Sequence, residues 1–382
     1  LARGGHAIDA IIAAQMVLNV VEPQSSGIGG GAFLLYYHAK NKHTQYFNGR
    51  ESAPSAAHSK MLLDNTGKPK KFHDAVRGGL SVGTPGLLKM LKQVHDKYGT
   101  LAWEQLFQPA INIARDGFAM DHKMHTILSE LDYLVDSPAI AKMFFNQDGR
   151  PKAIAQLLTN QPLADTFTTI AQEGIAPFYT GDIANAIVKS IQTSAHNRGL
   201  LSKADLASYK VKTGALICAP YRSYKVCSMP VPSSGGIALL QILGMLAQFN
   251  LAELEPNSLR AIHLIAEASK LAYADRNLYI ADIANVPVKQ LLDAAYLHQR
   301  AQLINPQQAN HHVSAGKLEI TLSYAIDKSQ IEMPSTTHIS VIDTAGNAIA
   351  MTSSIEYFFG STVMTNGFLL NNYYRDYICN VR

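Results

Sequence analysis

Residues 334–343 read PSTTHISVID, and this stretch predicts the central element of the fold. Polar and apolar side chains alternate from residue 337 to residue 342, as in a β-strand with one buried face. Residues 343–347 read DTAGN, which is a turn signal, and residues 348–355 return as a second strand-like run, AIAMTSSI. The stretch therefore predicts a β-hairpin.

The register of this hairpin brings hydroxyl groups together at one end. If Ile342 pairs with the first residue of the second strand, counting back along both strands places Thr336 opposite Ser354, within one residue. Thr352, Ser354 and Glu356 then share one face, because strand side chains alternate between faces. We therefore expect a hydroxyl-rich strand end facing hydroxyls on the neighbouring strand.

This hydroxyl-rich end has two interpretations. Thr has a high β-propensity, so threonines at strand ends are ordinary. Alternatively, the Ser335–Thr336 bond is a self-cleavage site, after which Thr336 carries both a nucleophilic hydroxyl and a free α-amine. An α-amine has a pKa of about 7.7 to 8, so part of it is neutral near neutral pH and accepts the hydroxyl proton. The pattern by itself leaves both interpretations open.

Several longer motifs, in a fixed order, bear on this choice. They are VEPQSSGIGGG (21–31), GRESAP (49–54), GTPG (83–86), ARDGF (114–118), PSSGG (232–236), EASKLAYADR (267–276), TTHISV (336–341), GNA (346–348), FGS (359–361) and LLNN (369–372). This set resembles the γ-glutamyltranspeptidases, N-terminal nucleophile hydrolases whose precursors cut themselves before a threonine. The resemblance covers most of the chain and favours the self-cleavage interpretation.

The resemblance implies an α/β (α+β) fold, a four-layer αββα sandwich of the N-terminal nucleophile hydrolase type. It also implies that residues 1–335 are the large-subunit part of a single domain and that residues 336–382 are the start of the small subunit. The chain begins within what the family has as its first helix, so we expect that an N-terminal segment and a leader are missing. The family's oxyanion-stabilising Ser-Ser and Gly-Gly segments are expected beyond Arg382.

The resemblance further implies an activity. After self-cleavage between Ser335 and Thr336, Thr336 attacks the γ-glutamyl amide of glutathione or a related compound, and the acyl group passes from the enzyme to water or to an amino acid or peptide. No cofactor and no metal are implied. The processed large and small subunits are expected to form a heterodimer in the periplasm or outside the cell.

A γ-glutamyl group carries an α-carboxylate and an α-ammonium, so its pocket needs a cation and an anion. By resemblance Arg50 holds the carboxylate, for which its planar fork is suited, and Asp376 holds the ammonium. Without the resemblance, Arg50 reads as a surface arginine and Asp376 as a solvated acid. Ser354 is also expected to contact the substrate, and Thr352 to support the site.

Two positions depart from the glutathione-acting members of the family. Glu356 stands where they carry Asn, and Tyr373 stands where they carry Glu or Gln. As an acid, Glu356 is expected to take part of the ammonium contact, whereas Tyr373 removes one acceptor. Two alternatives therefore stay open: a related acylase that acts on glutaryl-β-lactam side chains, and an inactive homologue that only binds or assembles.

Composition excludes several classes of protein. The 382 residues are 47% hydrophobic and 16% charged, which is typical of a folded chain with a large core. The formal net charge is +4 with no basic run, so we expect no nucleic-acid partner. No apolar run of about 18 residues occurs, so we expect no membrane span.

Cysteines and histidines give no metal-site pattern. The three cysteines, Cys218, Cys227 and Cys379, lack CxxC spacing, and the 14 histidines include no HExxH. Cys218 and Cys227 are close enough in sequence to pair, but the sparse, odd set favours buried thiols. We therefore expect neither a zinc site nor a disulfide framework.

Apolar periodicity predicts the remaining elements. Helices are expected at 7–21, 86–98 and 103–116, several more between 117 and about 194, and two at 237–249 and 259–278. Strands are expected at 32–37, 46–51 and 221–229. Loops are expected at 177–182 and 230–236. Residues 27–31, GIGGG, follow a helix and precede a strand, which is the wrong order for a phosphate loop and favours close backbone packing. The polar residues 307–335 are expected to form an exposed linker before the cleavage point.

Overall fold

The computed structural model describes residues 1–281, 285–319 and 335–373. Within them the chain forms two compact units, unit 1 from 1–214 and 335–373, and unit 2 from 215–281 and 285–319. This division is one of compactness, so the predicted cleavage boundary between 335 and 336 stays a prediction. Unit 1 contains α1 (Ala7–Val21), β1 (Gly31–His38), β2 (His43–Asn48), α2 (Phe72–Val76), η1 (Gly79–Ser81), α3 (Leu87–Tyr98), α4 (Trp103–Asp116), β3 (Phe118–Ala119), α5 (His122–Glu130), η2 (Asp132–Asp136), α6 (Pro138–Phe144), β4 (Leu157–Leu158), α7 (Gln161–Glu173), α8 (Ala176–Tyr179), α9 (Asp182–Gln192), α10 (Lys203–Ser208), β5 (Lys212–Gly214), β8 (Thr337–Ile342), β9 (Ala348–Ser354), β10 (Met364–Thr365) and β11 (Phe368–Leu369).

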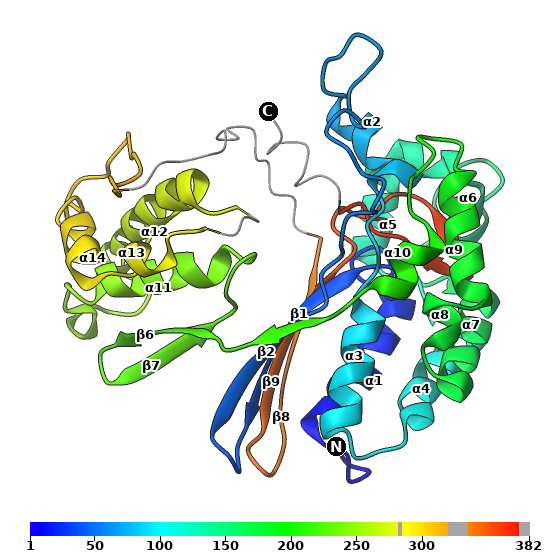
Figure 1. Cartoon of the computed structure of the whole chain (residues 1–382), viewed down its shortest axis with the longest axis horizontal. Coiled ribbons are helices and arrows are strands. Elements are labelled where there is room, and N and C mark those ends of the chain that lie inside the picture. Colours follow the sequence, from blue (N-terminus) through cyan, green and yellow to red (C-terminus); the bar gives the residue numbers. More distant parts are fainter. Residues whose placement is uncertain (282–284, 320–334, 374–382) are drawn as a thin grey trace. The chain divides into compact units, whose positions relative to one another are not determined.

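A five-stranded antiparallel sheet is the centre of unit 1, with the strand order β5-β2-β1-β9-β8 (Figure 1). The predicted hairpin is confirmed as β8 and β9, and Ile342 pairs with Ala348 as expected. The same register pairs Thr337 with Ser353, which places Thr336 opposite Ser354. β9 also pairs with β1. The β8–β9 hairpin is therefore part of the same sheet as strands from the N-terminal part of the chain.

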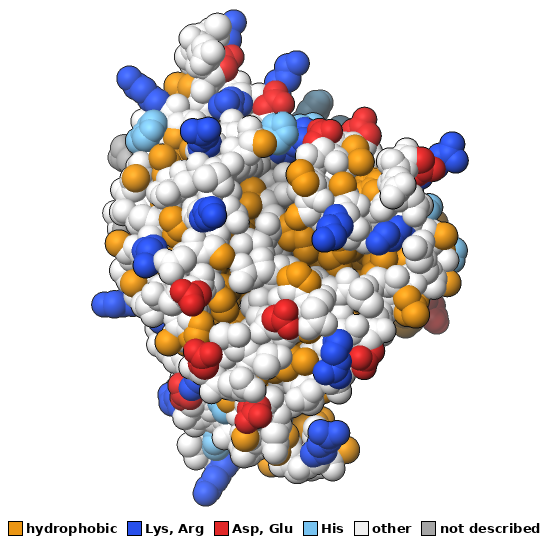
Figure 2. Space-filling view, turned by 90° about the vertical axis from the view of Figure 1, so that its right-hand side faces the viewer, with side chains coloured by type: hydrophobic (Ala, Val, Ile, Leu, Met, Phe, Trp, Pro, Cys, Tyr) orange, Lys and Arg blue, Asp and Glu red, His pale blue; other side chains and the backbone are white. Residues whose placement is uncertain are grey.

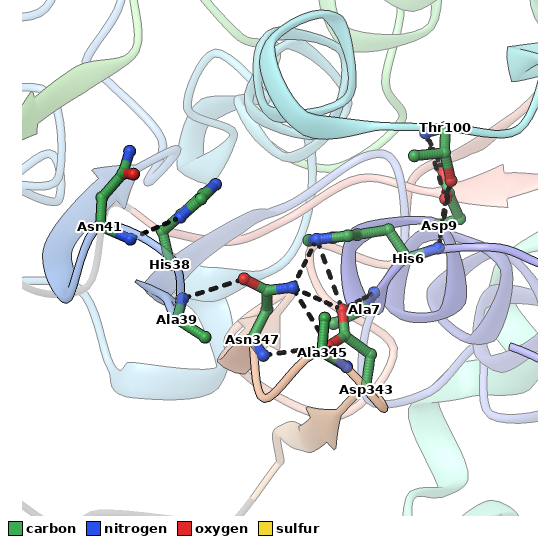
Figure 3. A network of polar contacts seen from close by, with 10 residues as sticks. All are labelled: His6, Ala7, Asp9, His38, Ala39, Asn41, Thr100, Asp343, Ala345 and Asn347. Carbon is green, nitrogen blue, oxygen red and sulfur yellow. Dashed lines mark hydrogen bonds and ion pairs between the residues drawn. The ribbon is translucent and has the colours of Figure 1, made fainter.

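The turn of this hairpin also holds the start of α1 (Figure 3). Asp343 Oδ1 accepts hydrogen bonds from the backbone N–H groups of Ala345 and Asn347, and Gly346 has a φ of 81°, which favours glycine. Asp343 Oδ2 accepts a hydrogen bond from the N–H of Ala7, the first residue of α1, and lies 3.4 Å from His6 Nε2. The Asp343 carboxylate therefore accepts hydrogen bonds both from the N–H groups of the turn and from a helix N-terminal N–H that has no partner within the helix.

Helices cover one face of the sheet. α1 packs on β8 and β9, α3 packs on β1 and β2, and α4 packs on α1 and α7. In α1, Ile8, Ile11 and Ile12 are fully buried at the i, i+3, i+4 spacing of an apolar helix face. α1 and α4 have the predicted bounds, and α3 begins one residue later than predicted.

The glycine-rich segment 27–31 packs closely against distant backbone, as predicted. A Cβ on Gly29 would lie 2.0 Å from the carbonyl oxygen of Leu369, and one on Gly30 would lie 2.1 Å from that of Ser354. A side chain on Gly29 would push this segment away from Leu369, and one on Gly30 would push it away from Ser354, the last residue of β9. The glycines therefore allow close approach of the backbone.

Unit 2 consists of a hairpin and a group of helices. Its elements are β6 (Ile217–Tyr221), β7 (Tyr224–Ser228), α11 (Gly235–Leu246), η3 (Leu251–Glu253), α12 (Leu259–Tyr279), α13 (Val288–Leu291) and α14 (Ala294–Ala301). α11 packs on α12 and α14. The predicted strand 221–229 is mostly β7, and its partner β6 was missed in the sequence, while the two long helices lie within three residues of their predicted bounds.

The expectation for Cys218 and Cys227 is wrong, because the two residues form a disulfide. They are directly paired across the β6–β7 hairpin, with their Cα atoms 4.1 Å apart. The sequence did not indicate that a turn would bring them face to face. The pairing of β6 with β7 is therefore reinforced covalently.

The structure describes all of the loop predicted at 177–182 and part of the linker predicted at 307–335. The predicted loop 177–182 is wrong in its first half, since α8 occupies Ala176–Tyr179 with Pro177 in its first turn, where a proline N–H is not needed. Of the predicted linker, residues 307–319 have no helix or strand, and residues 320–334 lie outside the described part of the chain.

The surface of unit 1 carries charges of both signs. Figure 2 shows Lys and Arg side chains interspersed with Asp and Glu on the face that the helices at the right of Figure 1 form. No helix in the described ranges is long and apolar enough to span a membrane. Among the residues that the structure describes, no group of three or more His, Cys, Asp and Glu side chains is placed to hold a metal ion.

Candidate active site

Thr336 lies immediately before β8. At this end of the sheet the predicted register brings hydroxyl groups of neighbouring strands together. Ser335 is buried and Thr336 is exposed, so the bond between them passes from the interior to the surface. Ser335 Oγ donates a hydrogen bond to the carbonyl oxygen of Gln24 at 3.3 Å. The predicted cleavage bond is therefore held on its N-terminal side, while the Thr336 side chain faces solvent.

Ser354 connects the groups around this bond. Its hydroxyl donates to the carbonyl oxygen of Ser335 at 2.8 Å and accepts from the backbone N–H of Glu356 at 2.8 Å. A hydroxyl has one proton and two lone pairs, so the 3.4 Å contact with Thr336 Oγ1 is one in which Thr336 donates. The Thr336 proton thus points at Ser354, and the single Ser354 proton polarises the Ser335 carbonyl.

A buried polar network supports the strand end from the helix side. Ser353 Oγ donates to Gln15 Oε1 at 2.5 Å, Gln15 Nε2 donates to Ser26 Oγ at 3.2 Å, and Ser26 Oγ contacts Thr337 Oγ1 at 3.3 Å. All four side chains are at most 9% exposed. Since buried polar groups are costly without partners, this network fixes the position of β8 next to Thr336.

Arg50 follows β2 at the same end of the sheet. Its Nη1 is ion-paired with Glu356 Oε1, and its Nε lies 3.7 Å from Glu51 Oε2. The guanidinium carbon lies 4.7 Å from the ring centre of Tyr373 and 5.7 Å from that of Phe33, within cation–π range. The predicted carboxylate-binding arginine is therefore only 18% exposed and is held by acids and rings.

The backbone at Arg50 is fixed as well. Tyr209 Oη donates to the Arg50 carbonyl oxygen at 2.5 Å, and the Arg50 N–H donates to Asn48 Oδ1 at 2.9 Å. Burial raises the pKa of the Tyr209 phenol, and the charge of Glu51 raises it further. Tyr209 therefore stays a neutral hydrogen-bond donor, and the guanidinium projects from an anchored main chain.

Glu356 has a φ of 76°, in the left-handed region that non-glycine residues seldom adopt. The strain is retained because the residue is fixed twice, through its N–H to Ser354 and its carboxylate to Arg50. Glu356 is thus the link between the hydroxyls at the predicted cleavage bond and the predicted carboxylate-binding arginine.

Asn371 and Asn372 tie this end of the sheet together. Asn371 Nδ2 donates to the carbonyl oxygens of Gly29 and Gly83, and its Oδ1 accepts from the N–H of Gly83. Asn372 Oδ1 accepts from the N–H of Tyr357 at 2.9 Å. The LLNN motif therefore fixes loops from three parts of the chain.

The predicted site residues can now be placed. Thr336, Ser335, Ser354, Glu356 and Arg50 form one continuous set of contacts. Thr352 lies on β9, two residues before Ser354, and its hydroxyl bonds to His338 Nδ1 at 2.7 Å. Asp376 lies outside the described residues.

Sequence reasoning missed other residues of the site. Tyr209 and Phe33 gave no signal, because an isolated aromatic residue reads as core. Gln24 and Ser26 lie inside the motif VEPQSSGIGGG, whose glycines predicted close backbone packing and gave no indication of the two polar side chains. The order of the motif alone indicated a packed loop, and the tertiary structure brings it into contact with Ser335, next to the predicted cleavage bond.

The chain is similar to several known proteins. Residues 1–381 match the family described as "Gamma-glutamyltranspeptidase". The chain is 38% identical over 387 residues to the "Glutathione hydrolase proenzyme" of Bacillus subtilis (strain 168), covering 99% of this chain and 65% of that protein. It is 34% identical over 383 residues to the "Acylase ACY 1 proenzyme" of Pseudomonas sp. (strain SE83), covering 98% of this chain and 66% of that protein.

A solved structure is similar as well. The γ-glutamyltranspeptidase of Helicobacter pylori is 33% identical, with a TM-score of 0.78, over 84% of this chain and 92% of that chain. The mixed α/β fold is therefore shared with this solved structure. Together with the match over residues 1–381, this shows that the chain belongs to the γ-glutamyltranspeptidase family of N-terminal nucleophile hydrolases.

Proposed function

We propose that this chain is part of an autoprocessed γ-glutamyl transferase or hydrolase that uses Thr336 as its nucleophile. One observation carries the proposal: contacts run without a break from Thr336 through Ser354 and Glu356 to Arg50. A nucleophile and a carboxylate-binding cation at one sheet end are what cleavage of a γ-glutamyl amide requires. The names of the proenzyme relatives support the same activity.

The proposed sequence begins with self-cleavage. The Thr336 hydroxyl attacks the Ser335 carbonyl, whose oxygen accepts a hydrogen bond from Ser354; the C–N bond breaks, the hydroxyl proton passes to the Thr336 nitrogen, and an ester remains. Water hydrolyses this ester, which releases the Ser335 carboxylate and restores the Thr336 hydroxyl beside a free α-amine. In the mature enzyme that amine takes the hydroxyl proton while Thr336 attacks the γ-amide. The released amine leaves with a proton, and water or an amino-group acceptor then resolves the acyl-enzyme.

The substrate contacts are also part of the proposal. Arg50 takes the α-carboxylate, Glu356 and Asp376 take the α-ammonium, and Ser354 orients the nucleophile. The carboxylate role of Arg50 is supported by its anchored backbone and by the rings that hold its guanidinium. The second candidate, an acylase for glutaryl amides, is favoured by the similarity to the Pseudomonas acylase.

Three further points belong to the proposal. The processed parts form a heterodimer within a four-layer αββα sandwich, a layering that is supported by the five-stranded sheet and the helices packed on it. The Cys218–Cys227 disulfide supports a periplasmic or extracellular location, since disulfides persist in oxidising compartments.

The test combines processing with turnover. The protein, in its full natural length, should yield two fragments with a new N-terminus at Thr336, and Thr336→Ala should remain one chain. Thr337→Ser serves as a matched control, because it changes the neighbouring threonine and leaves the nucleophile in place. Turnover of a γ-glutamyl anilide supports the proposal, turnover of glutaryl anilides alone supports the acylase, and neither points to a binding homologue. Cleavage at another bond refutes the nucleophile assignment.

A further inference from the structure

Residues 55–71, which we call the basic loop, begin shortly after Arg50 and lead into α2. Figure 1 shows this loop projecting beyond α2. Where the loop enters α2, the ring of Phe72 lies 5.5 Å from that of Tyr357. Tyr357 directly follows Glu356, the ion-pair partner of Arg50. Both ends of the basic loop therefore adjoin residues of the candidate active site.

The basic loop has a defined structure of its own. Met61 and Leu62 are buried in a small apolar cluster. At the tip, Asp64 Oδ1 accepts hydrogen bonds from the backbone N–H groups of Thr66 and Lys68, at 2.8 and 3.0 Å. The backbone N–H of Asp64 in turn donates to the Lys68 carbonyl oxygen at 2.7 Å. The turn and the apolar cluster therefore fix the main chain from which the charged side chains project.

Positive charge on the basic loop is not balanced within the loop. It carries four lysines, Lys60, Lys68, Lys70 and Lys71, and one acid, Asp64. Hydrogen bonds within the tip turn lower the pKa of the Asp64 carboxyl and occupy one of its oxygens. Lys70 is half-buried and donates to a side-chain amide oxygen at 3.1 Å. Lys60, Lys68 and Lys71 are exposed, and within the described part of the chain none of the three is ion-paired with a carboxylate.

The spacing of these lysines favours a ligand with several negative charges. Lys68 is four residues from Phe72, so the chain between them spans at most about 14 Å. One exposed pair of a lysine and a carboxylate contributes little, because water and salt screen it. A ligand with one carboxylate therefore gains little from the basic loop, whereas an extended acidic peptide of about four residues meets several ammonium groups.

We propose that the basic loop binds the leaving group of acyl donors in which a γ-glutamyl unit is joined to the N-terminus of an acidic peptide. The γ-glutamyl unit lies between Arg50 and Thr336, and the carboxylates of the peptide pair with Lys71, Lys68 and Lys60. The loop makes and breaks no bond; it holds the part of the donor that leaves as the free amine. This inference rests on the proposed function and names a substrate class, γ-glutamyl derivatives of acidic peptides.

The turnover experiment compares γ-glutamyl-triaspartate with γ-glutamyl-trialanine, using the protein in its full natural length. Wild type should favour the aspartate donor in kcat/KM through a lower KM, and raising the ionic strength should reduce this preference. The double variant Lys68→Gln/Lys71→Gln should lower the preference by about twofold to thirtyfold, as expected for the loss of two exposed ion pairs. The control, Lys40→Gln/Lys42→Gln, removes two exposed lysines between β1 and β2, at the opposite end of the sheet from Arg50, and should keep the preference. A preference that is absent in wild type, or unchanged in Lys68→Gln/Lys71→Gln, overturns the inference.

A binding experiment on the same preparations needs no turnover. Fluorescence anisotropy with a dye-labelled tetra-aspartate, which has no γ-glutamyl unit, should show weaker binding by Lys68→Gln/Lys71→Gln than by wild type and the control. This pattern without turnover of γ-glutamyl-p-nitroanilide refutes the proposed function and supports the basic loop as a surface for acidic peptides. Turnover of the anilide without binding of the peptide supports the proposed function and overturns the inference. Binding of vesicles that contain phosphatidylglycerol, but not of the peptide, also overturns it. Equal melting temperatures and equal anilide turnover show that both variants are folded.

Discussion

At the scale of single residues, the Ser354 hydroxyl forms hydrogen bonds with three other groups of the candidate site. Its one proton goes to the Ser335 carbonyl, and its lone pairs receive the Glu356 N–H and the Thr336 hydroxyl. Three partners use the full hydrogen-bonding capacity of the side chain. Ser354 is therefore placed to polarise the predicted cleavage bond and to orient the proposed nucleophile.

Replacing Ser354 with Ala removes the donor to the cleavage carbonyl. Self-cleavage should slow by on the order of a hundredfold to a thousandfold, the usual effect of losing one oxyanion donor. Ser354→Thr should restore most of the rate, because it keeps the hydroxyl. Time courses of fragment appearance on denaturing gels measure the effect. A Ser354→Ala variant that matures at the wild-type rate would assign this role to another group.

Arg50 provides a second prediction at this scale. Arg50→Lys keeps the positive charge but loses the planar fork, so kcat/KM for γ-glutamyl donors should fall by about tenfold to a hundredfold, or about 1.4 to 3 kcal/mol. A donor without the α-carboxylate, a 4-aminobutyryl anilide, should be affected much less. Steady-state kinetics on both donors make the comparison. Equal losses on the two donors would mean that Arg50 supports the fold and not the recognition of the carboxylate.

At the scale of elements, the Asp343 turn joins the hairpin to α1. Burial raises the pKa of the Asp343 carboxyl, but hydrogen bonds from Asn347 and Ala7 and the nearby His6 outweigh it, so the pKa is lowered in the folded protein. A lowered folded pKa stabilises the fold above the unfolded value, about 3.9, and that stabilisation is lost as the pH falls below it.

Asp343→Asn should therefore destabilise the protein at pH 6, by about 1.5 to 3 kcal/mol, the range for hydrogen bonds to a charged group. The difference from wild type should shrink at pH 3, where the wild-type carboxyl is increasingly protonated. Urea midpoints at the two pH values test this expectation. Asp148→Asn, on an exposed loop, is the control and should change neither midpoint appreciably. A pH-independent difference would show that shape and not charge matters at this turn.

At the scale of the whole molecule, the predicted cleavage divides a single sheet. β8 and β9 follow the Ser335–Thr336 bond, whereas β1, β2 and β5 precede it, and β9 is hydrogen-bonded to β1 along seven residue pairs. Buried side chains of α1 also pack on β8 and β9. The two parts therefore share one sheet and one core.

Cleavage should consequently leave the two fragments associated. After maturation they should elute together in size-exclusion chromatography under native conditions and separate only in denaturant, because sheet pairing and core packing do not depend on the cut bond. The uncleaved Thr336→Ala chain is the control and should elute at the same position. Fragments that separate in native buffer would contradict the pairing of β9 with β1.

The sequence by itself determined much of this protein. The alternation in 337–342 and the turn residues of 343–347 fixed the hairpin and its register, since side-chain period and turn chemistry are local. That register correctly placed Thr336 opposite Ser354. The helical periods at 7–21 and 103–116 gave the bounds of α1 and α4 for the same reason.

Only the tertiary structure decided which distant groups meet. Arg50 and Glu356 are separated by 306 residues, and their ion pair follows from the pairing of β1 with both β2 and β9. The Cys218–Cys227 disulfide depends on a turn that composition did not reveal, and Tyr209 reaches the Arg50 carbonyl across 159 residues. Such contacts arise from packing in three dimensions, on which local periodicity carries no information.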